Sequence, residues 1–260
     1  MPLVKEKDIR IYNISECCVF RKTKEMFGGL SNMASGFPLR VNDIKILSSE
    51  ALYQACKFPH YPDIQGKIIS EKSPMTSKMV CKPYNNKIRE DWEDIKVKVM
   101  RWCLQVKLAQ NYIKFGTLLD STYDKYIVEE SHKDIFWGAI NKNNQLSGVN
   151  ALGRLLMELR KSYYENRFSH DLFVISPLSI SDFKLFGETI VDIDERANII
   201  MHIKDSLKLE NKNIIDNTQS VNYDCGNNEN EIIEERKTEK EKRKKKKPKK
   251  DNDRQTALPF

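Results

Sequence analysis

The residues best suited to chemistry are an acid and an amine in one short segment, Glu50 and Lys57. Seven positions separate them, which is two turns of an α-helix, so a helix through this segment places both on one face. Tyr53 and Gln54 lie between them in the sequence. An acid and an amine aimed the same way can form a catalytic pair. The alternative is a solvated surface stripe, which the spacing taken alone favours.

A helix over residues 48–58 is expected to carry this pair. Two serines at its start can cap it, and Glu50 in its first turn suits the positive end of the helix dipole. Pro59 cannot continue the helix, which is therefore expected to stop near Phe58. Just upstream, apolar residues alternate over 39–47 around an Asn-Asp turn pair, which predicts a hairpin that leads into the helix.

Composition bounds the kind of protein. The chain has 260 residues and 40% hydrophobic residues, enough for one sizeable domain with additional segments. It contains no run of 18 apolar residues, and its first residues lack the apolar core of a secretory signal, so neither a membrane span nor a membrane partner is expected. The six cysteines show no metal-ligand spacing and are expected to be reduced intracellular thiols. No metal and no cofactor is expected.

The positive charge is concentrated near the end of the chain. Residues 236–250 contain eleven Lys or Arg and two Glu, a charge of +9, so the remaining residues carry −2 of the total of +7. The run 242–250 is expected to attract nucleic-acid phosphates with strong salt dependence. It also resembles a nuclear-localisation signal, which predicts an intracellular protein, nuclear in a eukaryotic host and otherwise cytoplasmic. The alternative is a solvated linker.

The last six residues form a second motif. Gln255–Phe260 has the pattern Gln-x-x-Leu-x-Phe, which resembles peptides that dock on DNA sliding clamps. A basic run followed by such a peptide suits a protein that works on DNA. A sliding clamp is therefore expected as a further partner, although short motifs of this kind also recur by chance.

The remaining pattern is mainly helical. Helices are expected from Pro62, from Ser73-Pro74, over 91–111 and over 150–164, strands over 17–22 and 126–129, and a polar loop over 141–147. On the long helix, Trp92 and Trp102 are expected to be core residues rather than ligand contacts. These elements predict a main domain over 1–166. An appended ordered segment over 167–207, with two strands and a helix, and a disordered basic tail over 208–260 are expected to follow.

Five sequence blocks, in this order, carry a resemblance to the NADAR family, also called the YbiA-like family, over roughly residues 18–165. The blocks are Phe-Gly-Gly-Leu-Ser-Asn-Met at 27–33, the segment 49–58, Ser-Pro-Met at 73–75, Val-Glu at 128–129 with Asp-Ile-Phe-Trp-Gly at 134–138, and the segment 148–160. The resemblance implies a compact, mainly helical α+β domain acting on N-glycosidic bonds of nucleotide-like substrates. Roles in the family include removal of ADP-ribose from guanine in nucleic acid and hydrolysis of reactive riboflavin-pathway intermediates. Ala139 departs from the pattern, since many YbiA-type members carry an acid there, which leaves subgroup and substrate open.

The resemblance also implies roles for the first pair. A lysine matching Lys57 attacks the anomeric carbon and forms a Schiff base, and Glu50 is expected to act as its acid/base partner. The amine must be neutral part of the time. Because a free lysine has a pKa of about 10.4, burial or a nearby cation has to lower it.

The other blocks supply the expected substrate-binding residues, which are Asn32, Tyr53, Gln54, Glu129, Asp134, Trp137, Gly138 and Asn150. Trp137 can stack on a base or ribose, or be a core residue. The two asparagines can hydrogen-bond the substrate, or merely cap turns and helices. Glu129 and Asp134 are expected to be supporting carboxylates, or simply charges at a strand end.

The sequence therefore predicts an N-glycosidase that removes ADP-ribose from a nucleobase and reaches DNA through its tail. One alternative is an N-glycosidase acting on riboflavin intermediates. Another is a non-catalytic module that binds ADP-ribose or nucleic acid. The presence of both Glu50 and Lys57 argues against the module, since a pure binder has little need for both.

Overall fold

The structure is a computed structural model that describes residues 5–166 and 173–201. These residues belong to one compact unit, Met1–His202. The predicted tail over 208–260 and its Gln255–Phe260 peptide lie outside the described residues, and the predicted domain division at residue 166 stays a prediction. None of the described helices is long and apolar enough to cross a membrane.

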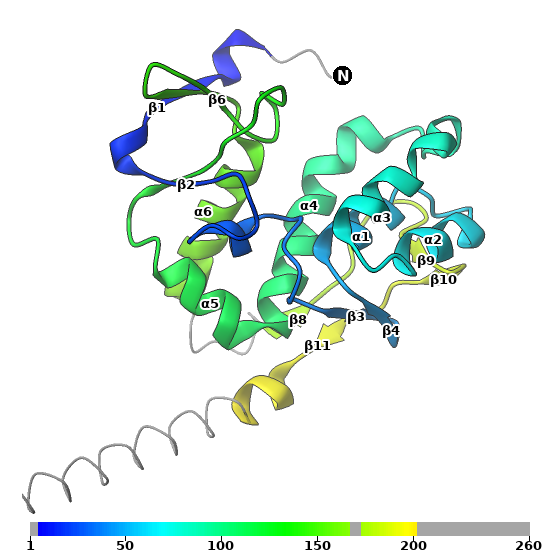
Figure 1. The fold of residues 1–260 in the computed structure, drawn as a ribbon. Coiled ribbons are helices and arrows are strands. Elements are labelled where there is room, and N and C mark those ends of the chain that lie inside the picture. The colour runs from blue at the N-terminus through cyan, green and yellow to red at the C-terminus, as the bar shows by residue number, and fades with distance from the viewer. Residues whose placement is uncertain (1–4, 167–172, 202–260) are drawn as a thin grey trace, which may run out of the picture. The chain divides into compact units, whose positions relative to one another are not determined.

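The helices are arranged around one long central helix, α4 (Trp92–Gln110) (Figure 1). On one side α1 (Ser49–Ala55) packs on α4, and α2 (Pro62–Ile69) and α3 (Pro74–Val80) pack on α1. The other side carries α5 (Tyr112–Asp120) and α6 (Ala151–Glu165). Short 3-10 helices lie at η1 (Glu6–Asp8), η2 (Ile14–Glu16), η3 (Gly28–Leu30) and η4 (Lys82–Lys87). The predicted helices from 62, 73, 91 and 150 are thus confirmed.

The strands form small separate sheets. An antiparallel sheet has the order β1 (Arg10–Asn13), β7 (Gln145–Gly148), β6 (Ile140–Lys142). A parallel pair joins β2 (Cys17–Phe20) to β5 (Tyr126–Glu129), with Phe20 opposite Glu129. The predicted hairpin over 39–47 is confirmed as β3 (Leu39–Val41) and β4 (Ile44–Ile46). Its Asn-Asp pair has φ angles of 45° and 63°, the left-handed conformation that a tight hairpin turn needs.

Two sequence-based expectations are corrected. The segment 141–147 is not a loop but the hairpin of β6 and β7, because Asn143 and Asn144 take φ angles of 52° and 63° and close a tight turn. The helix predicted over 48–58 ends at Ala55. The Lys57 and Phe58 amides bond three residues back rather than four, so Lys57 lies in a tight turn beyond the helix.

The described part of the segment after α6, residues 173–201, contains four very short strands rather than the predicted two, and its residues 196–201 are helical. The strands form two antiparallel pairs, β8 (Val174–Ile175) with β11 (Ile193–Asp194) and β9 (Lys184–Leu185) with β10 (Glu188–Thr189). Trp102 packs edge-on against Phe183, with ring centroids 4.9 Å apart, and its Nε1 donates to Ser176 O at 3.0 Å. Trp102 is therefore a core residue, as predicted. The whole is an α+β, mainly helical fold, which also agrees with the sequence.

Candidate active site

A cavity of about 630 Å³ contains both residues of the predicted catalytic pair. Eight of the ten predicted site residues line it: Asn32, Glu50, Tyr53, Gln54, Lys57, Glu129, Asp134 and Trp137. Gly138 and Asn150 are not among the lining residues. Within residues 5–166 and 173–201, no group of three or more His, Cys, Asp or Glu side chains is arranged to hold a metal ion.

Glu50 is held in a fixed position at the start of α1. Ser48 caps this helix, since its Oγ accepts from the Ala51 amide at 3.2 Å. The Glu50 side chain is only 4% exposed, and each of its oxygens accepts a hydrogen bond from a neighbouring amide group. Asn32 Nδ2 donates to Oε2 and Gln54 Nε2 donates to Oε1, both at 2.7 Å. The carboxylate is thereby aimed into the cavity by two residues that the sequence had suggested as substrate ligands.

The loop that carries Asn32 is itself fixed by a buried lysine. Lys107 on α4 has no exposed surface, and its Nζ donates to Gly29 O at 2.8 Å and Ser31 O at 3.1 Å. Burial lowers the pKa of Lys107 to about 7. Asn32 O in turn accepts from the Glu50 amide at 3.2 Å. A continuous set of hydrogen bonds therefore runs from the centre of α4 through this loop to the Glu50 segment.

Lys57 reaches the same cavity from the turn after α1. Its amine is half-buried and lies 5.4 Å from the ring centroid of Trp92 and 5.7 Å from that of Tyr53. Burial lowers the pKa of Lys57 and Lys78 acts in the same direction, while Glu50 is among the groups that oppose the shift. The partners found for the Lys57 amine among the described residues are these two rings. A lowered pKa is the direction of shift that nucleophilic attack by an amine requires.

Three aromatic side chains form one wall of the cavity. Tyr53 packs against Trp92 with ring centroids 5.0 Å apart and edge-on against Trp137 at 5.8 Å. Trp92 is only 6% exposed, as expected for a core residue, yet it also lines the cavity. Trp137 is half-buried and faces the cavity, so the structure places it in the wall.

The backbone around Trp137 is fixed on both sides. Asp134 Oδ1 accepts from the amides of Phe136 and Trp137, both at 2.9 Å. The Leu152 amide, in the first turn of α6, donates to Trp137 O at 3.1 Å, which satisfies one of the free amides at the helix start. Asp134 thus positions the tryptophan as well as lining the cavity.

Glu129 is the second carboxylate with a shifted titration. It lies at the end of β5, and burial, with smaller contributions from Asp134 and Glu50, raises the pKa of Glu129 to about 7. A carboxyl group in this range can hold a proton at neutral pH and still release it. Glu129 was expected to be only a supporting carboxylate, whereas in the structure it lines the cavity with a raised pKa.

Gly138 and Asn150 do not line the cavity and contact the backbone of Glu129 instead. Asn150 is buried with φ of 52°, and its side chain accepts from the Glu129 amide at 3.2 Å and donates to Ile127 O at 2.9 Å. A Cβ atom on Gly138 would lie 2.5 Å from Glu129 O, so only glycine permits this approach. Both residues hold strand β5 in place. They are therefore better described as supports of the site.

Several residues of the site were not predicted from the sequence. Lys96 lines the cavity, where its Nζ donates to Glu93 Oε2 at 2.6 Å and lies 4.3 Å from the ring centroid of Phe136. Lys107, on the same helix α4, is fully buried. A usable signal existed, because each lysine follows a buried residue of α4 by four positions and so continues its apolar face.

The comparisons with known proteins agree with this fold. The chain belongs to the NADAR family, whose domain model matches residues 19–163, close to the predicted 18–165. It is 32% identical over 142 residues to N-glycosidase YbiA of Escherichia coli K12, a match covering 55% of this chain and 85% of that protein. The NMR structure of E. coli YbiA has a TM-score of 0.52 and 30% identity, covering 59% of this chain and 88% of that one.

A second group of relatives carries other names. The chain is 33% identical over 161 residues to a riboflavin biosynthesis protein of Vibrio vulnificus, covering 61% of this chain and 42% of that protein. It is 35% identical over 109 residues to the chloroplastic riboflavin biosynthesis protein PYRR of Arabidopsis thaliana, covering 40% and 18%. The chain thus spans less than half of these longer proteins. The relatives together support the prediction of a glycosidase that hydrolyses N-glycosyl compounds.

Proposed function

We propose that this chain is an N-glycosidase that removes ADP-ribose from guanine in nucleic acid through a Schiff base on Lys57. One observation carries the proposal. The amine with a lowered pKa and two carboxyl groups, Glu50 and Glu129, open into one cavity walled by aromatic rings. The relatives named N-glycosidases support the reaction class.

The proposed reaction begins at the anomeric carbon. The neutral Lys57 amine attacks this carbon, forming a C–N bond as the glycosidic C–N bond breaks and its electron pair leaves with the base. The lysine nitrogen then loses a proton and its lone pair opens the sugar ring, whose oxygen is protonated, which gives the Schiff base. Water adds to the imine carbon and forms a carbinolamine. This intermediate expels the lysine amine, which releases ADP-ribose and restores Lys57.

The two carboxyl groups divide the remaining tasks. Glu50, fixed by two amide donors, stabilises the positive charge that develops at the anomeric carbon and serves as acid/base partner of Lys57. Glu129, whose pKa is raised to about 7, supplies a proton to the departing base. Tyr53 and Trp137 offer ring faces on which a base can stack, a contact worth about 1–3 kcal/mol.

We further propose that nucleic acid is recruited by the basic run over 242–250 and a sliding clamp by Gln255–Phe260. These proposals rest on the sequence, with eleven positive charges over 236–250. A polycationic segment raises the local concentration of nucleic acid in a salt-dependent way. An intracellular site of action, nuclear in a eukaryotic host, belongs to the same proposal.

A second candidate substrate is a reactive riboflavin-pathway intermediate. It is favoured by the names of the Vibrio and Arabidopsis relatives. The same chemistry would apply, because an N-glycosidic bond is broken in both cases. A non-catalytic binding module remains the third possibility and requires that no bond be broken.

The test compares substrates and tail variants. The full chain is incubated with guanine-ADP-ribosylated DNA, and separately with riboflavin-pathway intermediates, and the released sugar is measured. The proposal expects release from DNA that slows when residues 236–260 are deleted. Activity on the intermediates alone, unchanged by the deletion, would favour the second candidate. Tight binding of ADP-ribose without release from either substrate would favour the module.

A further inference from the structure

The residues that follow the family match lie against the turn that carries Lys57. The match ends at residue 163, while residues 181–186, here called the brace, include β9 and pack beside α2 (Figure 1). We infer that the brace positions Lys57, and that Arg89 and Gln65 are the positioning residues that connect them. The inference rests on the proposed function only in so far as Lys57 is taken as the nucleophile.

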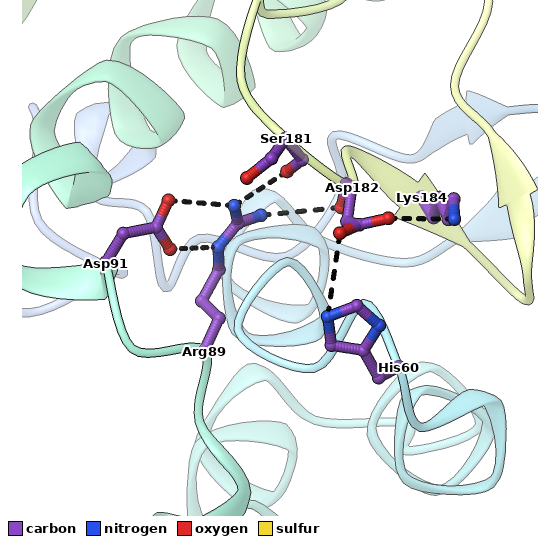
Figure 2. Close-up of polar contacts among 6 residues, drawn as sticks. All are labelled: His60, Arg89, Asp91, Ser181, Asp182 and Lys184. Carbon is purple, nitrogen blue, oxygen red and sulfur yellow. Dashed lines mark hydrogen bonds and ion pairs between the residues drawn. The ribbon is translucent and has the colours of Figure 1, made fainter.

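Arg89 makes the first connection. Its backbone amide donates to Lys57 O at 3.0 Å, so it holds the lysine turn directly. Arg89 is buried, with 9% of the residue exposed. Its guanidinium donates to Ser181 O at 2.7 Å and to Asp182 O at 3.4 Å (Figure 2). One residue therefore ties the brace, through its side chain, to the peptide unit of Lys57, through its backbone amide.

The guanidinium is itself held in one orientation. Asp91 binds it with both oxygens, at 2.6 Å to Nε and 2.9 Å to Nη2 (Figure 2). Bidentate pairs of this kind fix direction as well as distance. Asp91 precedes α4 but makes no side-chain cap of that helix, because its carboxylate is used by Arg89.

The brace has its own anchors. Asp182 pairs with Lys184 Nζ at 2.8 Å and with His60 Nε2 at 3.8 Å (Figure 2). His60 is only three residues beyond Lys57, so this pair adds a contact on the far side of the same turn. These side chains are partly exposed, so solvent screens both ion pairs. Their importance lies in direction rather than in energy.

Gln65 makes the second connection and is fully buried. Its Nε2 donates to Lys184 O at 3.1 Å and to Ala55 O at 3.3 Å, and its Oε1 accepts from the Phe186 amide at 2.7 Å. Ala55 is the last residue of α1. The turn of Lys57 is therefore fixed to the brace at both ends, at Ala55 O through Gln65 and at Lys57 O through Arg89.

This arrangement answers a need of the proposed nucleophile. Because Lys57 lies beyond a helix of only seven residues, only its amide bonds back to α1, at Gln54 O, and its carbonyl accepts from the Arg89 amide instead. A displacement of about 1 Å in a reacting group can cost about 100-fold in rate. The brace therefore acts on the placement and burial of the Lys57 amine through Arg89 and Gln65, neither of which lines the cavity.

The experiment compares Arg89→Met with two controls in the full chain. Asn42→Gly removes the bonds that Asn42 makes to Thr189 O and to the Val191 amide, which attach the same C-terminal segment away from Lys57. Arg101→Met removes the exposed ion pair between Arg101 on α4 and Glu158 on α6. Three measurements are made. The first is amide hydrogen exchange of peptide 55–61, the second is the pH midpoint for acetylation of Lys57 by an amine-reactive reagent, and the third is steady-state kinetics, which gives kcat and KM.

We expect Arg89→Met to speed exchange in peptide 55–61 about tenfold or more and to raise the acetylation midpoint. We also expect kcat to fall about 10- to 100-fold with KM changed less than about threefold. Both controls should leave exchange and midpoint unchanged. A folded Arg89→Met protein with native exchange in 55–61 and a native midpoint overturns the inference. If this variant does not fold, Gln65→Met is held to the same two readouts.

The outcome also separates this inference from the proposed function. Exchange and acetylation are measured without substrate, so they report on the brace even if no glycosidic bond is cleaved. A native chain without activity on any substrate, combined with faster exchange in Arg89→Met, would end the proposed function and leave the brace in place.

Discussion

Asn32 Nδ2 donates a 2.7 Å hydrogen bond to Glu50 Oε2, and both side chains are buried. The bond joins the loop after η3 to the first turn of α1 and ties a carboxylate in the cavity to the rest of the fold. The other amide atom of the same side chain, Asn32 Oδ1, is buried without a hydrogen-bond partner among the described residues. Asn32 therefore supports Glu50 and also has an unused hydrogen-bond acceptor at the cavity.

Replacement of Asn32 should separate positioning from folding. We expect Asn32→Ala to lower kcat about 10- to 100-fold, because the buried Glu50 carboxylate loses one of its two hydrogen-bond donors. Asn32→Asp should be worse, since it places a second carboxylate against Glu50. Steady-state kinetics and thermal unfolding of both variants give the comparison. Native kcat in either variant would show that Glu50 needs no such support.

The raised pKa of Glu129 predicts an alkaline limb in the activity profile. As the proton donor, Glu129 must be protonated, so kcat should fall as the pH rises through about 7. Glu129→Gln should lower kcat about 100- to 10,000-fold, the usual range for a general acid. It should also abolish this limb. A limb near neutral pH that survives in Glu129→Gln would assign it to another group.

The same pKa makes a prediction for stability. Between pH 4.5, the ordinary value, and about 7, folded Glu129 holds a proton that the unfolded chain has lost. Its contribution to stability is therefore present at low pH and is lost as the pH rises through this range. Denaturant titrations should show the native chain losing stability relative to Glu129→Gln between pH 5 and about 7. A constant difference would contradict the raised pKa.

Lys107 should give the opposite slope at higher pH. Its pKa is about 7 in the folded chain and 10.5 ordinarily, so between these values only the unfolded state carries the proton. Stability then rises with pH over that range, because protonation favours the unfolded state. The free energy of unfolding of the native chain minus that of Lys107→Met should grow from pH 7 to about 9. Lys161→Met is the control, since that lysine is exposed and paired with Glu165; a flat difference for Lys107→Met would contradict the account.

Gly153 tests how closely α6 must approach β5. A Cβ atom there would overlap Ile127 O and crowd the side chain of Asn150. Gly153→Ala should therefore destabilise the chain by about 1–3 kcal/mol, although alanine is the better helix former. Gly66→Ala, in α2 with only ordinary contact to Phe186, should be neutral or stabilising by up to about 1 kcal/mol. Equal effects of the two substitutions on thermal unfolding would contradict the packing argument.

Local signals in the sequence were sufficient for most of the fold. The Ser48 cap, the Asn-Asp turn at 42–43 and the apolar stripe of α4 depend on neighbours within a few positions, and each is found as expected. The exceptions also have local causes. The Asn-Asn turn at 143–144 closes a hairpin with few apolar residues, and the helix before Pro59 tightens and ends early at Ala55.

The site was only partly predictable because its supports come from distant parts of the chain. Lys107 binds the loop at Gly29 across 78 positions, and Arg89 binds Ser181 across 92. Such contacts leave no spacing signal. Asn150 was predicted to hydrogen-bond the substrate, whereas its side chain bonds the backbone of β5, and periodicity cannot distinguish these two kinds of partner.

The most direct test of the central claim is reductive trapping on Lys57. The full chain is treated with guanine-ADP-ribosylated DNA and borohydride, digested, and searched by mass spectrometry for a reduced sugar on the peptide containing Lys57. Lys57→Ala and, as a matched control, Lys161→Ala, whose lysine is exposed and paired with Glu165 on α6, are treated alike. The account predicts an adduct on Lys57 in the native chain and in Lys161→Ala, and none in Lys57→Ala. Release of ADP-ribose with no adduct on Lys57, or with full activity in Lys57→Ala, would contradict it.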